Sequence, residues 1–307
     1  MIHILCCIDN NYCMPLGVLI KSIILKNTTP ITFHIMANNV QSSNKNLLSS
    51  LTDHITSHII FYDINEDLLN SMPIRETGYL SIATYMRIFA QKILPDNLNK
   101  ILYLDCDILV NKPLDELWNI DIDDFSIASV LDVITFNEDV YKRLNYNKNE
   151  GYFNAGVLLI NLKKWRKINL LKQALDYIQS NRQQIINEDQ DVLNALLHKD
   201  KKLIPLKFNA TYSVFEKQSL FLKDYNEEVE EAIYKPIIIH FTYIKPWNKE
   251  CNHPYQYLFE EILKTTPWKN NKKTYFFKGK KKIIYIVKQW LIKLHIKPLK
   301  KSYLRQL

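Results

Sequence analysis

Lys100-Ile-Leu-Tyr-Leu-Asp-Cys-Asp-Ile-Leu-Val110 is an apolar run that contains two carboxylates, Asp105 and Asp107, separated by one residue. The apolar residues on both sides predict a strand that is buried on both faces, as in a parallel sheet. Residues two apart on an extended chain point to the same side, so the two carboxylates converge. Because bare carboxylates beside an apolar core repel each other and lose hydration, a cation between them relieves both costs. We interpret the run as a buried strand ending in a metal site, with a solvated turn as the alternative for this motif alone.

The composition favours one large core, with or without a small appendage: the chain has 307 residues, of which 47% are hydrophobic and 12% aromatic. Its five cysteines form no Cys-x-x-Cys pair and follow no signal peptide, which fits a reducing compartment. The five glycines form neither a dinucleotide-binding motif nor a P-loop, since Val157 stands where the P-loop Lys is required. If a nucleotide binds, a metal held by Asp105 and Asp107 is the expected means of neutralising its phosphates.

Strands and helices alternate at the spacing of βαβ units, which predicts an α/β fold around a mainly parallel sheet. The other predicted strands are Ile2–Ile8, Ile31–Met36, His58–Tyr62, Ser126–Asp132, Val157–Leu162 and Ile237–His240. The predicted helices run from Pro15 to about Lys26, from Ser42 to about Asp53, over Leu80–Ala90 and Pro113–Trp118, and onward from Lys163 and from Glu188.

Polar residues at the ends of these strands are the first candidate ligand contacts. Asp9, Asn11 and Tyr12 follow the first strand, where base and ribose contacts are expected; ordinary turn chemistry is the alternative. Asp132 adds a carboxylate at the end of a later strand.

A second informative segment is Gly151-Tyr-Phe-Asn-Ala-Gly156. Asn154 is followed by Ala155 and Gly156, whose small side chains let a ligand approach the backbone; a structural Asn in a turn is the alternative.

Asp189, Gln190 and Asp191 lie in the first turn of a predicted helix. The helix dipole accounts for the two acids but not for Gln190. His240 ends the last predicted strand. A donor set of one imidazole and the carboxylates of Asp105 and Asp107 suits Mn²⁺ better than Mg²⁺, which prefers ligands that are all oxygen.

The C-terminal segment differs in charge from the rest of the chain. Residues 269–307 contain twelve Lys, one Arg and no acid, so this tail carries +13 and leaves −5 on residues 1–268 from the net charge of +8. Within it, Ile283, Ile286, Val287, Trp290, Leu291 and Leu294 fall on one helical stripe. We interpret 1–268 as the folded domain and 269–307 as a basic amphipathic tail that associates with a membrane surface; docking on the body and nucleic-acid binding are the alternatives.

Four segments together give a resemblance to a known family. They are Tyr103-Leu-Asp-Cys-Asp107, Tyr152-Phe-Asn-Ala-Gly-Val-Leu-Leu-Ile-Asn-Leu-Lys-Lys-Trp165, Asp189-Gln-Asp191 and His240 followed by Lys245-Pro-Trp247. In this order they resemble the family 8 retaining glycosyltransferases, above all the bacterial lipooligosaccharide and lipopolysaccharide galactosyl- and glucosyltransferases, over roughly residues 2–250.

The resemblance implies a GT-A fold, a single nucleotide-sugar-binding domain that uses a UDP-hexose donor and Mn²⁺, with Mg²⁺ as the alternative metal. It implies that Asp105, Asp107 and His240 bind the metal and that Asp132 lies on the acceptor side. The donor contacts that it implies are Cys7 through its backbone, Asp9, Asn11, Tyr12, Arg87, Asp105, Asn154, Ala155, Asp189, Gln190 and Lys245. The chain departs from the family pattern between His240 and Lys245, where a Gly and one further residue are missing and Tyr243 is present. Lys245 is therefore carried over with less support than His240.

The expected reaction moves galactose or glucose from the UDP-sugar to a lipid-linked lipooligosaccharide or lipopolysaccharide glycan with retention. Gln190 is an uncharged amide and therefore a poor nucleophile, so a double displacement would have to proceed through Asp189. Front-side attack, with Gln190 orienting the sugar, is favoured instead. The expected location is cytoplasmic, peripheral on the inner face of the bacterial cytoplasmic membrane, with no nucleic acid as partner. A metal-dependent sugar-nucleotide hydrolase and a non-catalytic nucleotide-sugar or lipid-binding module are the alternatives. Donor epimer, acceptor, linkage and oligomeric state are left open.

Overall fold

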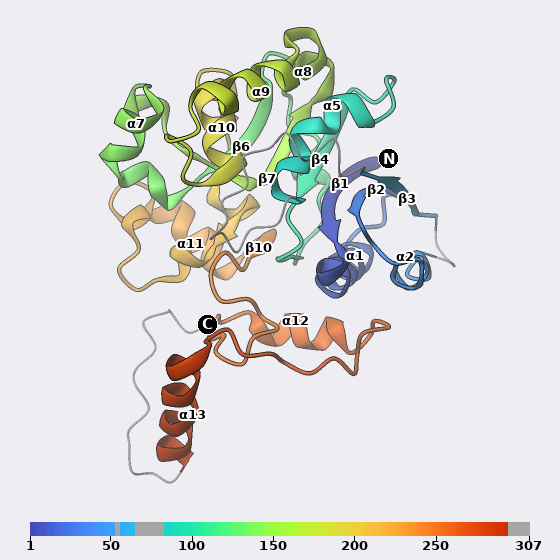
Figure 1. Ribbon diagram of the computed structural model, residues 1–307, viewed down its shortest axis with the longest axis vertical. Coiled ribbons are helices and arrows are strands. Elements are labelled where there is room, and N and C mark those ends of the chain that lie inside the picture. The colour runs from blue at the N-terminus through green and yellow to red at the C-terminus, as the bar shows by residue number, and fades with distance from the viewer. Residues whose placement is uncertain (53–55, 65–82, 294–307) are drawn as a thin grey trace.

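A mixed sheet forms the centre of the molecule in the computed structural model, which describes residues 1–52, 56–64 and 83–293. Within these residues the sheet has seven strands in the order β3-β2-β1-β4-β7-β6-β8 (Figure 1). Its strands are β1 (Ile2–Asp9), β2 (Ile31–Asn38), β3 (His58–Asp63), β4 (Lys100–Leu104), β6 (Ile127–Leu131), β7 (Phe153–Asn161) and β8 (Lys201–Leu203). Every neighbouring pair is parallel except the two that involve β7, which confirms the predicted mainly parallel α/β sheet.

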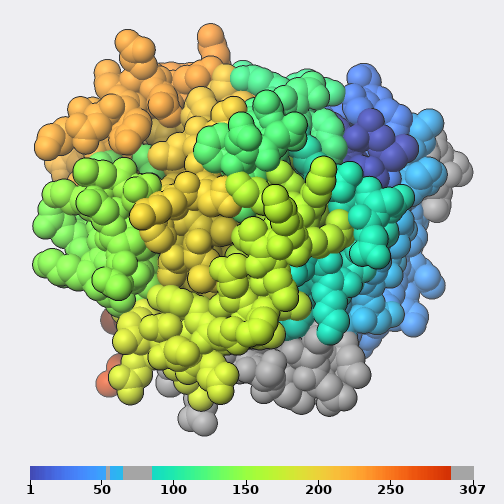
Figure 2. All heavy atoms as spheres, turned by 90° about the horizontal axis from the view of Figure 1, so that it is seen from above, coloured from blue at the N-terminus to red at the C-terminus, as the bar shows by residue number. Residues whose placement is uncertain are grey.

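Helices cover both faces of this sheet, with α1 and α2 on the opposite side from α5 and α8 (Figure 1). The α-helices before the last strand are α1 (Cys13–Lys26), α2 (Ser42–Ser49), α4 (Ala83–Met86), α5 (Ala90–Ile93), α6 (Asp115–Trp118), α7 (Glu138–Leu144), α8 (Leu162–Ile168), α9 (Leu170–Ser180), α10 (Glu188–Leu197) and α11 (Asn226–Tyr234). Seen from above, the blue N-terminal residues lie opposite the green and orange segments around α7 and α11, and the yellow-green α8 and α9 cross the middle (Figure 2).

Strand β1 shows why the sheet is buried on both faces. Ile4 and Cys6 pack into the core that contains α1, whereas Leu5 and Cys7 pack into the core on the other face, with α4, α5 and α8. This alternation follows from the two-residue period of a strand. The near-continuous apolar sequence of β1 is therefore required by its position.

The run from Lys100 to Val110 is not one strand, and this expectation was wrong. β4 ends at Leu104, the chain turns through Asp105, Cys106 and Asp107, and Ile108–Val110 forms β5 in a second sheet. That three-stranded sheet, in the described part of the chain, places β10 (Ile238–His240) between β5 and β9 (Ala210–Thr211). Hydropathy does not reveal the break because the residues on both sides of the turn are buried.

Strand β7 begins earlier than predicted. The expected strand starts at Val157, but β7 starts at Phe153, so Asn154, Ala155 and Gly156 lie within a strand and not in a turn. Asn161 ends the strand and accepts a hydrogen bond from the Lys164 N–H at 2.9 Å, which caps α8.

The segment expected as a helix over Leu80–Ala90 is described only from residue 83, where it is divided into α4, a 3₁₀ turn at Arg87–Phe89, and α5. Its first residues lie outside the described part, as does the predicted end of the second helix at Asp53.

The C-terminal region contains α12 (Gln256–Leu263), which packs against α1, and α13 (Gly279–Lys293), which lies at the end of the molecule opposite α8 and α9 (Figure 1). α13 contacts the body through Tyr285, whose hydroxyl donates to the Lys249 carbonyl at 2.9 Å. Ile283, Ile284, Val287 and Trp290 are exposed on it. Leu294 of the predicted stripe is outside the described residues. No helix in the described ranges has the length and apolar character needed to cross a bilayer.

Candidate active site

A cavity of about 730 Å³ lies where β4, β6 and β10 end, next to the start of β7 and of α10. Its lining residues are Arg87, Asp105, Asp107, Asp132, Val133, Ile134, Asn154, Ala155, Gly156, Ile186, Asn187, Asp189, Gln190, Thr211, Tyr212, Ser213, Glu216, His240, Thr242, Tyr243 and Lys245. Ligands of open α/β sheets bind at such strand ends. Residues from seven separate segments of the sequence therefore meet around one cavity.

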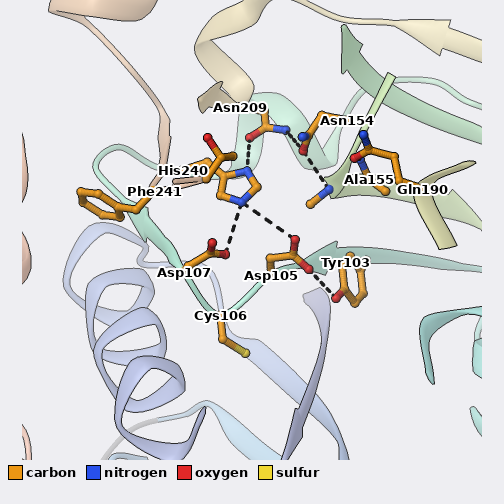
Figure 3. Close-up of polar contacts among 12 residues, drawn as sticks. Tyr103, Asp105, Cys106, Asp107, Asn154, Ala155, Gln190, Asn209, His240 and Phe241 are labelled. Atoms are coloured by element: carbon orange, nitrogen blue, oxygen red, sulfur yellow. Dashed lines mark hydrogen bonds and ion pairs between the residues drawn. The ribbon is translucent and has the colours of Figure 1, made fainter. Parts of the chain in front are cut away.

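Asp105, Asp107 and His240 form a cluster whose ligand atoms all lie within 4.8 Å of one another, and no other such group of three or more is present among the described residues. His240 Nε2 is 3.2 Å from Asp107 Oδ1 and 3.9 Å from Asp105 Oδ2. Figure 3 shows the imidazole between these carboxylates on one side and Asn209 on the other. Two carboxylates and one imidazole are a suitable donor set for a divalent cation.

Lys245 lies beside this cluster, where its ammonium forms a salt bridge with Asp107. Burial opposes ionisation of Asp107, but the neighbouring Lys245 and His240 outweigh it and hold the pKa of this carboxyl below its usual range. The carboxylate is therefore ionised and available to a cation at neutral pH. The shorter connection from His240 thus still brings Lys245 to the cluster.

Arg87 connects the cluster to α10. Its Nη2 donates to Asp105 Oδ1 at 3.0 Å, and its Nε lies 2.8 Å from Asp189 Oδ2 in an ion pair. Its guanidinium also donates to the Ala155 carbonyl and stacks over the Tyr103 ring, with 4.1 Å between its Cζ and the ring centroid. Burial disfavours the charge of Arg87, yet the two carboxylates outweigh this and raise its pKa. Arg87 is thus a fixed buried cation.

Asp189 and Gln190 lie side by side in the sequence but have different surroundings. Asp189 is buried, and burial raises its pKa to about 7, against the opposing charge of Arg87. Gln190 Oε1 accepts a hydrogen bond from the Ala155 N–H at 2.9 Å, and its Nε2 donates to Asp132 at 3.4 Å. The amide of Gln190 is thereby oriented by β7 and by the end of β6.

Gly156 has a specific packing role. A Cβ at this position would lie 2.3 Å from His240 Cε1 and 2.8 Å from Asp105 Oδ2, far inside contact distance. The missing side chain at Gly156 therefore leaves room for His240 and Asp105, which belong to the acidic cluster of Asp105, Asp107 and His240. It also leaves room for a ligand that approaches β7.

Four of the predicted donor contacts lie outside the lining of this cavity: Cys7, Asp9, Asn11 and Tyr12. Asp9 Oδ1 accepts the Asn11 N–H at 2.8 Å, which is ordinary turn chemistry. Tyr12 is nonetheless close enough to the cluster that the charge of Asp107 adds to burial in raising the pKa of its hydroxyl. The remaining predicted residues are brought together around the cavity.

Sequence reasoning missed the segment around β9, which contributes Thr211, Ser213 and Glu216 to the lining. It also missed Asn209, which is not part of the cavity lining but lies 2.9 Å from His240 Nδ1. The available signal was the alternation of Asn209, Thr211 and Ser213 with apolar residues, which has the period of a strand.

The profile described as "Glycosyl transferase family 8" matches residues 3–251. The chain belongs to this family. It is 31% identical over 267 residues to the lipopolysaccharide 1,2-glucosyltransferase of Escherichia coli K12, covering 86% of this chain and 78% of that protein. It is 26% identical over 273 residues to the lipopolysaccharide 1,3-galactosyltransferase of Salmonella typhimurium, covering 85% of this chain and 77% of that one.

Among solved structures, the chain is similar to the galactosyltransferase LgtC in complex with donor and acceptor sugar analogues. The likeness has a TM-score of 0.79 at 26% identity and covers 87% of this chain and 96% of LgtC. It confirms the predicted GT-A fold. The predicted family and the glycosyltransferase class are likewise confirmed.

Proposed function

We propose that this family 8 glycosyltransferase transfers galactose or glucose from a UDP-sugar to a lipopolysaccharide or lipooligosaccharide glycan, with retention at the transferred sugar and with a divalent metal. The observation that carries the proposal is the acidic cluster of Asp105, Asp107 and His240 in the wall of a cavity that also contains Asp189 and Gln190. The relatives named above act on lipopolysaccharide, one with glucose and one with galactose, which supports both the acceptor class and the two donor choices.

The donor set fits the metal that the family implies. Asp105, Asp107 and His240 would hold it, and their mixture of oxygen and nitrogen atoms favours Mn²⁺ over Mg²⁺. When bound, the metal supplies positive charge that stabilises the departing diphosphate.

The residues that would hold the donor lie on both sides of this cluster. Asp9, Asn11, Tyr12 and the Cys7 backbone, at the end of β1, would hold the uridine, and Lys245 would contact the diphosphate. The sugar would lie in the cavity against Arg87, Asp105, Asn154, Ala155, Asp189 and Gln190.

We favour front-side transfer over a covalent intermediate. A nucleophilic Asp189 would have to leave its ion pair with Arg87, and its buried carboxyl has a raised pKa that lowers the ionised fraction. In the front-side route the bond from the anomeric carbon to the diphosphate oxygen breaks as the acceptor hydroxyl bonds to the same face. The hydroxyl proton passes to the departing oxygen. Gln190, fixed through Ala155, would orient the sugar.

On the acceptor side, Asp132 lies at the end of β6 and faces the cavity beside Asn154. The tail from residue 269 is proposed to hold the enzyme at the inner face of the bacterial cytoplasmic membrane, where lipid-linked acceptors are presented. The exposed apolar residues of α13, a helix that also contains five lysines, support this role.

The test measures UDP release and glycoside formation from a panel of UDP-sugars with Mn²⁺, with and without a lipooligosaccharide-type acceptor that ends in β-galactose. Acceptor-stimulated release with one hexose, and an α-linked product by NMR, are expected. Asp107→Asn should abolish metal-dependent turnover, since it removes one anionic ligand.

Two outcomes oppose the proposal. Release of UDP without any glycoside product would indicate a sugar-nucleotide hydrolase. Binding of a UDP-sugar without turnover under every condition would indicate a binding module.

A further inference from the structure

We propose that Asn209 is a positioning residue that fixes the His240 ring with its proton on Nδ1, so that the lone pair of Nε2 faces Asp105 and Asp107. This inference rests on the proposed metal site, because an imidazole nitrogen binds a metal only through its lone pair. The assignment follows from a chain of hydrogen bonds whose far end has fixed donors and acceptors.

The chain starts at Asn154, whose amide orientation is determined twice. Its Oδ1 accepts a hydrogen bond from the Gly156 N–H at 2.9 Å, and a backbone N–H can only donate. Its Nδ2 lies 2.7 Å from Asp132 Oδ2, and an ionised carboxylate can only accept. Both contacts therefore give the same assignment of oxygen and nitrogen in the Asn154 amide.

The orientation of Asn209 follows from that of Asn154. The Asn209 amide lies 2.8 Å from Asn154 Oδ1, an acceptor, so the contacting atom is the donor Nδ2. The opposite end of the same amide is then its oxygen, which lies 2.9 Å from His240 Nδ1 (Figure 3). Because this oxygen can only accept, Nδ1 carries the proton, and in the neutral ring Nε2 keeps its lone pair.

The surroundings hold this arrangement in place. Asn209, Asn154 and His240 are all buried, so water does not replace a lost partner without cost. Asn209 directly precedes β9, whose Thr211 pairs with His240 of β10. The register of these two strands therefore fixes the distance between Asn209 and the imidazole. Metal-bound histidines are commonly oriented by such a hydrogen bond from the ring nitrogen that does not bind the metal.

The experiment compares Mn²⁺ affinity in the full-length protein with UDP present, using the EPR signal of unbound Mn²⁺. Asn209→Leu should weaken binding about 10- to 100-fold. Asn209→Asp keeps an acceptor for Nδ1 but loses the donor to Asn154, so its Mn²⁺ affinity should fall less than that of Asn209→Leu. Asn111→Leu is the matched control, since the Asn111 amide donates to the Pro236 carbonyl just before β10 at 3.2 Å and does not contact His240.

A second measurement reads the ring directly. In wild type loaded with UDP and diamagnetic Cd²⁺, ¹⁵N NMR of ring-labelled histidine should show the His240 proton on Nδ1, with the signal assigned by its absence in His240→Gln. A proton on Nε2 overturns the inference.

The affinity results separate the two proposals. If wild type binds Mn²⁺ and Asp107→Asn does not, the metal site stands, and unchanged affinity in Asn209→Leu then overturns the positioning role alone. Equal losses in the Leu and Asp variants, matched by equal thermal destabilisation, indicate a merely structural role and also overturn it. Absence of Mn²⁺ binding by folded wild type overturns both.

Discussion

Replacing Gly156 by alanine adds one methyl group that points at His240 and Asp105. The new Cβ would lie 2.3 Å from His240 Cε1, whereas ordinary contact begins at 3.4 Å, so the ring must retreat by about 1.1 Å. Asp105 must also shift, because its Oδ2 would be 2.8 Å from the methyl group. His240 is buried and held at Nδ1 by Asn209. Asp105 is held at Oδ1 by Arg87 and Tyr103, so both shifts strain existing contacts.

The expected effect on function is larger than the effect on stability. A displacement of about 1 Å in a preorganised site costs roughly 100-fold in turnover, and we expect Mn²⁺ affinity to fall at least about 10-fold. Overpacking of a core position costs about 1–3 kcal/mol of unfolding free energy, which leaves the protein folded.

The assay titrates Mn²⁺ and measures UDP release for Gly156→Ala beside Gly17→Ala. Gly17 is a matched control because a Cβ there would also lie 2.3 Å from its nearest neighbour, Trp268 Cζ3, but in the contact between α1 and the C-terminal region. Gly17→Ala should lose stability and keep its Mn²⁺ affinity. If Gly156→Ala keeps both affinity and turnover within about twofold, the reasoning about this close approach is refuted.

Three further predictions concern stability and localisation. Arg143→Leu should cost about 3 kcal/mol in chemical denaturation, because it leaves fully buried Asp191 without the cation that lies 2.6 Å away; a loss near zero contradicts this. His253 is buried against aromatic rings, and burial lowers its pKa from 6.5 to about 3. Between these pH values the unfolded chain binds one more proton at His253 than the folded chain does, so this residue alone lowers stability by about 1.4 kcal/mol per pH unit as the pH drops from 6.5 toward 3. His253→Phe should therefore reduce the measured slope by one proton. Deleting residues 279–307 should release the protein from acidic lipid vesicles in a sedimentation assay, and unchanged sedimentation would remove the membrane proposal.

The sequence by itself determined the fold class and the family, and it predicted ten of the residues that line the cavity. Apolar runs with strand period, separated by helical segments, are enough to predict an α/β sheet because burial on both faces leaves a direct imprint on sequence. Asp105 and Asp107 were recognisable because carboxylates inside such a run are costly without a cation. His240, Gln190 and Lys245 were found through motifs, and the structure brings all of them to one cavity.

Only the tertiary structure decided what depends on contacts between distant segments. The break between β4 and β5 follows from different pairing partners, β1 and β7 on one side and β10 on the other, which hydropathy does not encode. Asn209 gained its place beside His240 through the register of β9 and β10, although the two residues are 31 positions apart. The need for Gly156 arises likewise from a side chain on another strand. Local sequence specifies strands, but strand pairing across the fold specifies which side chains meet.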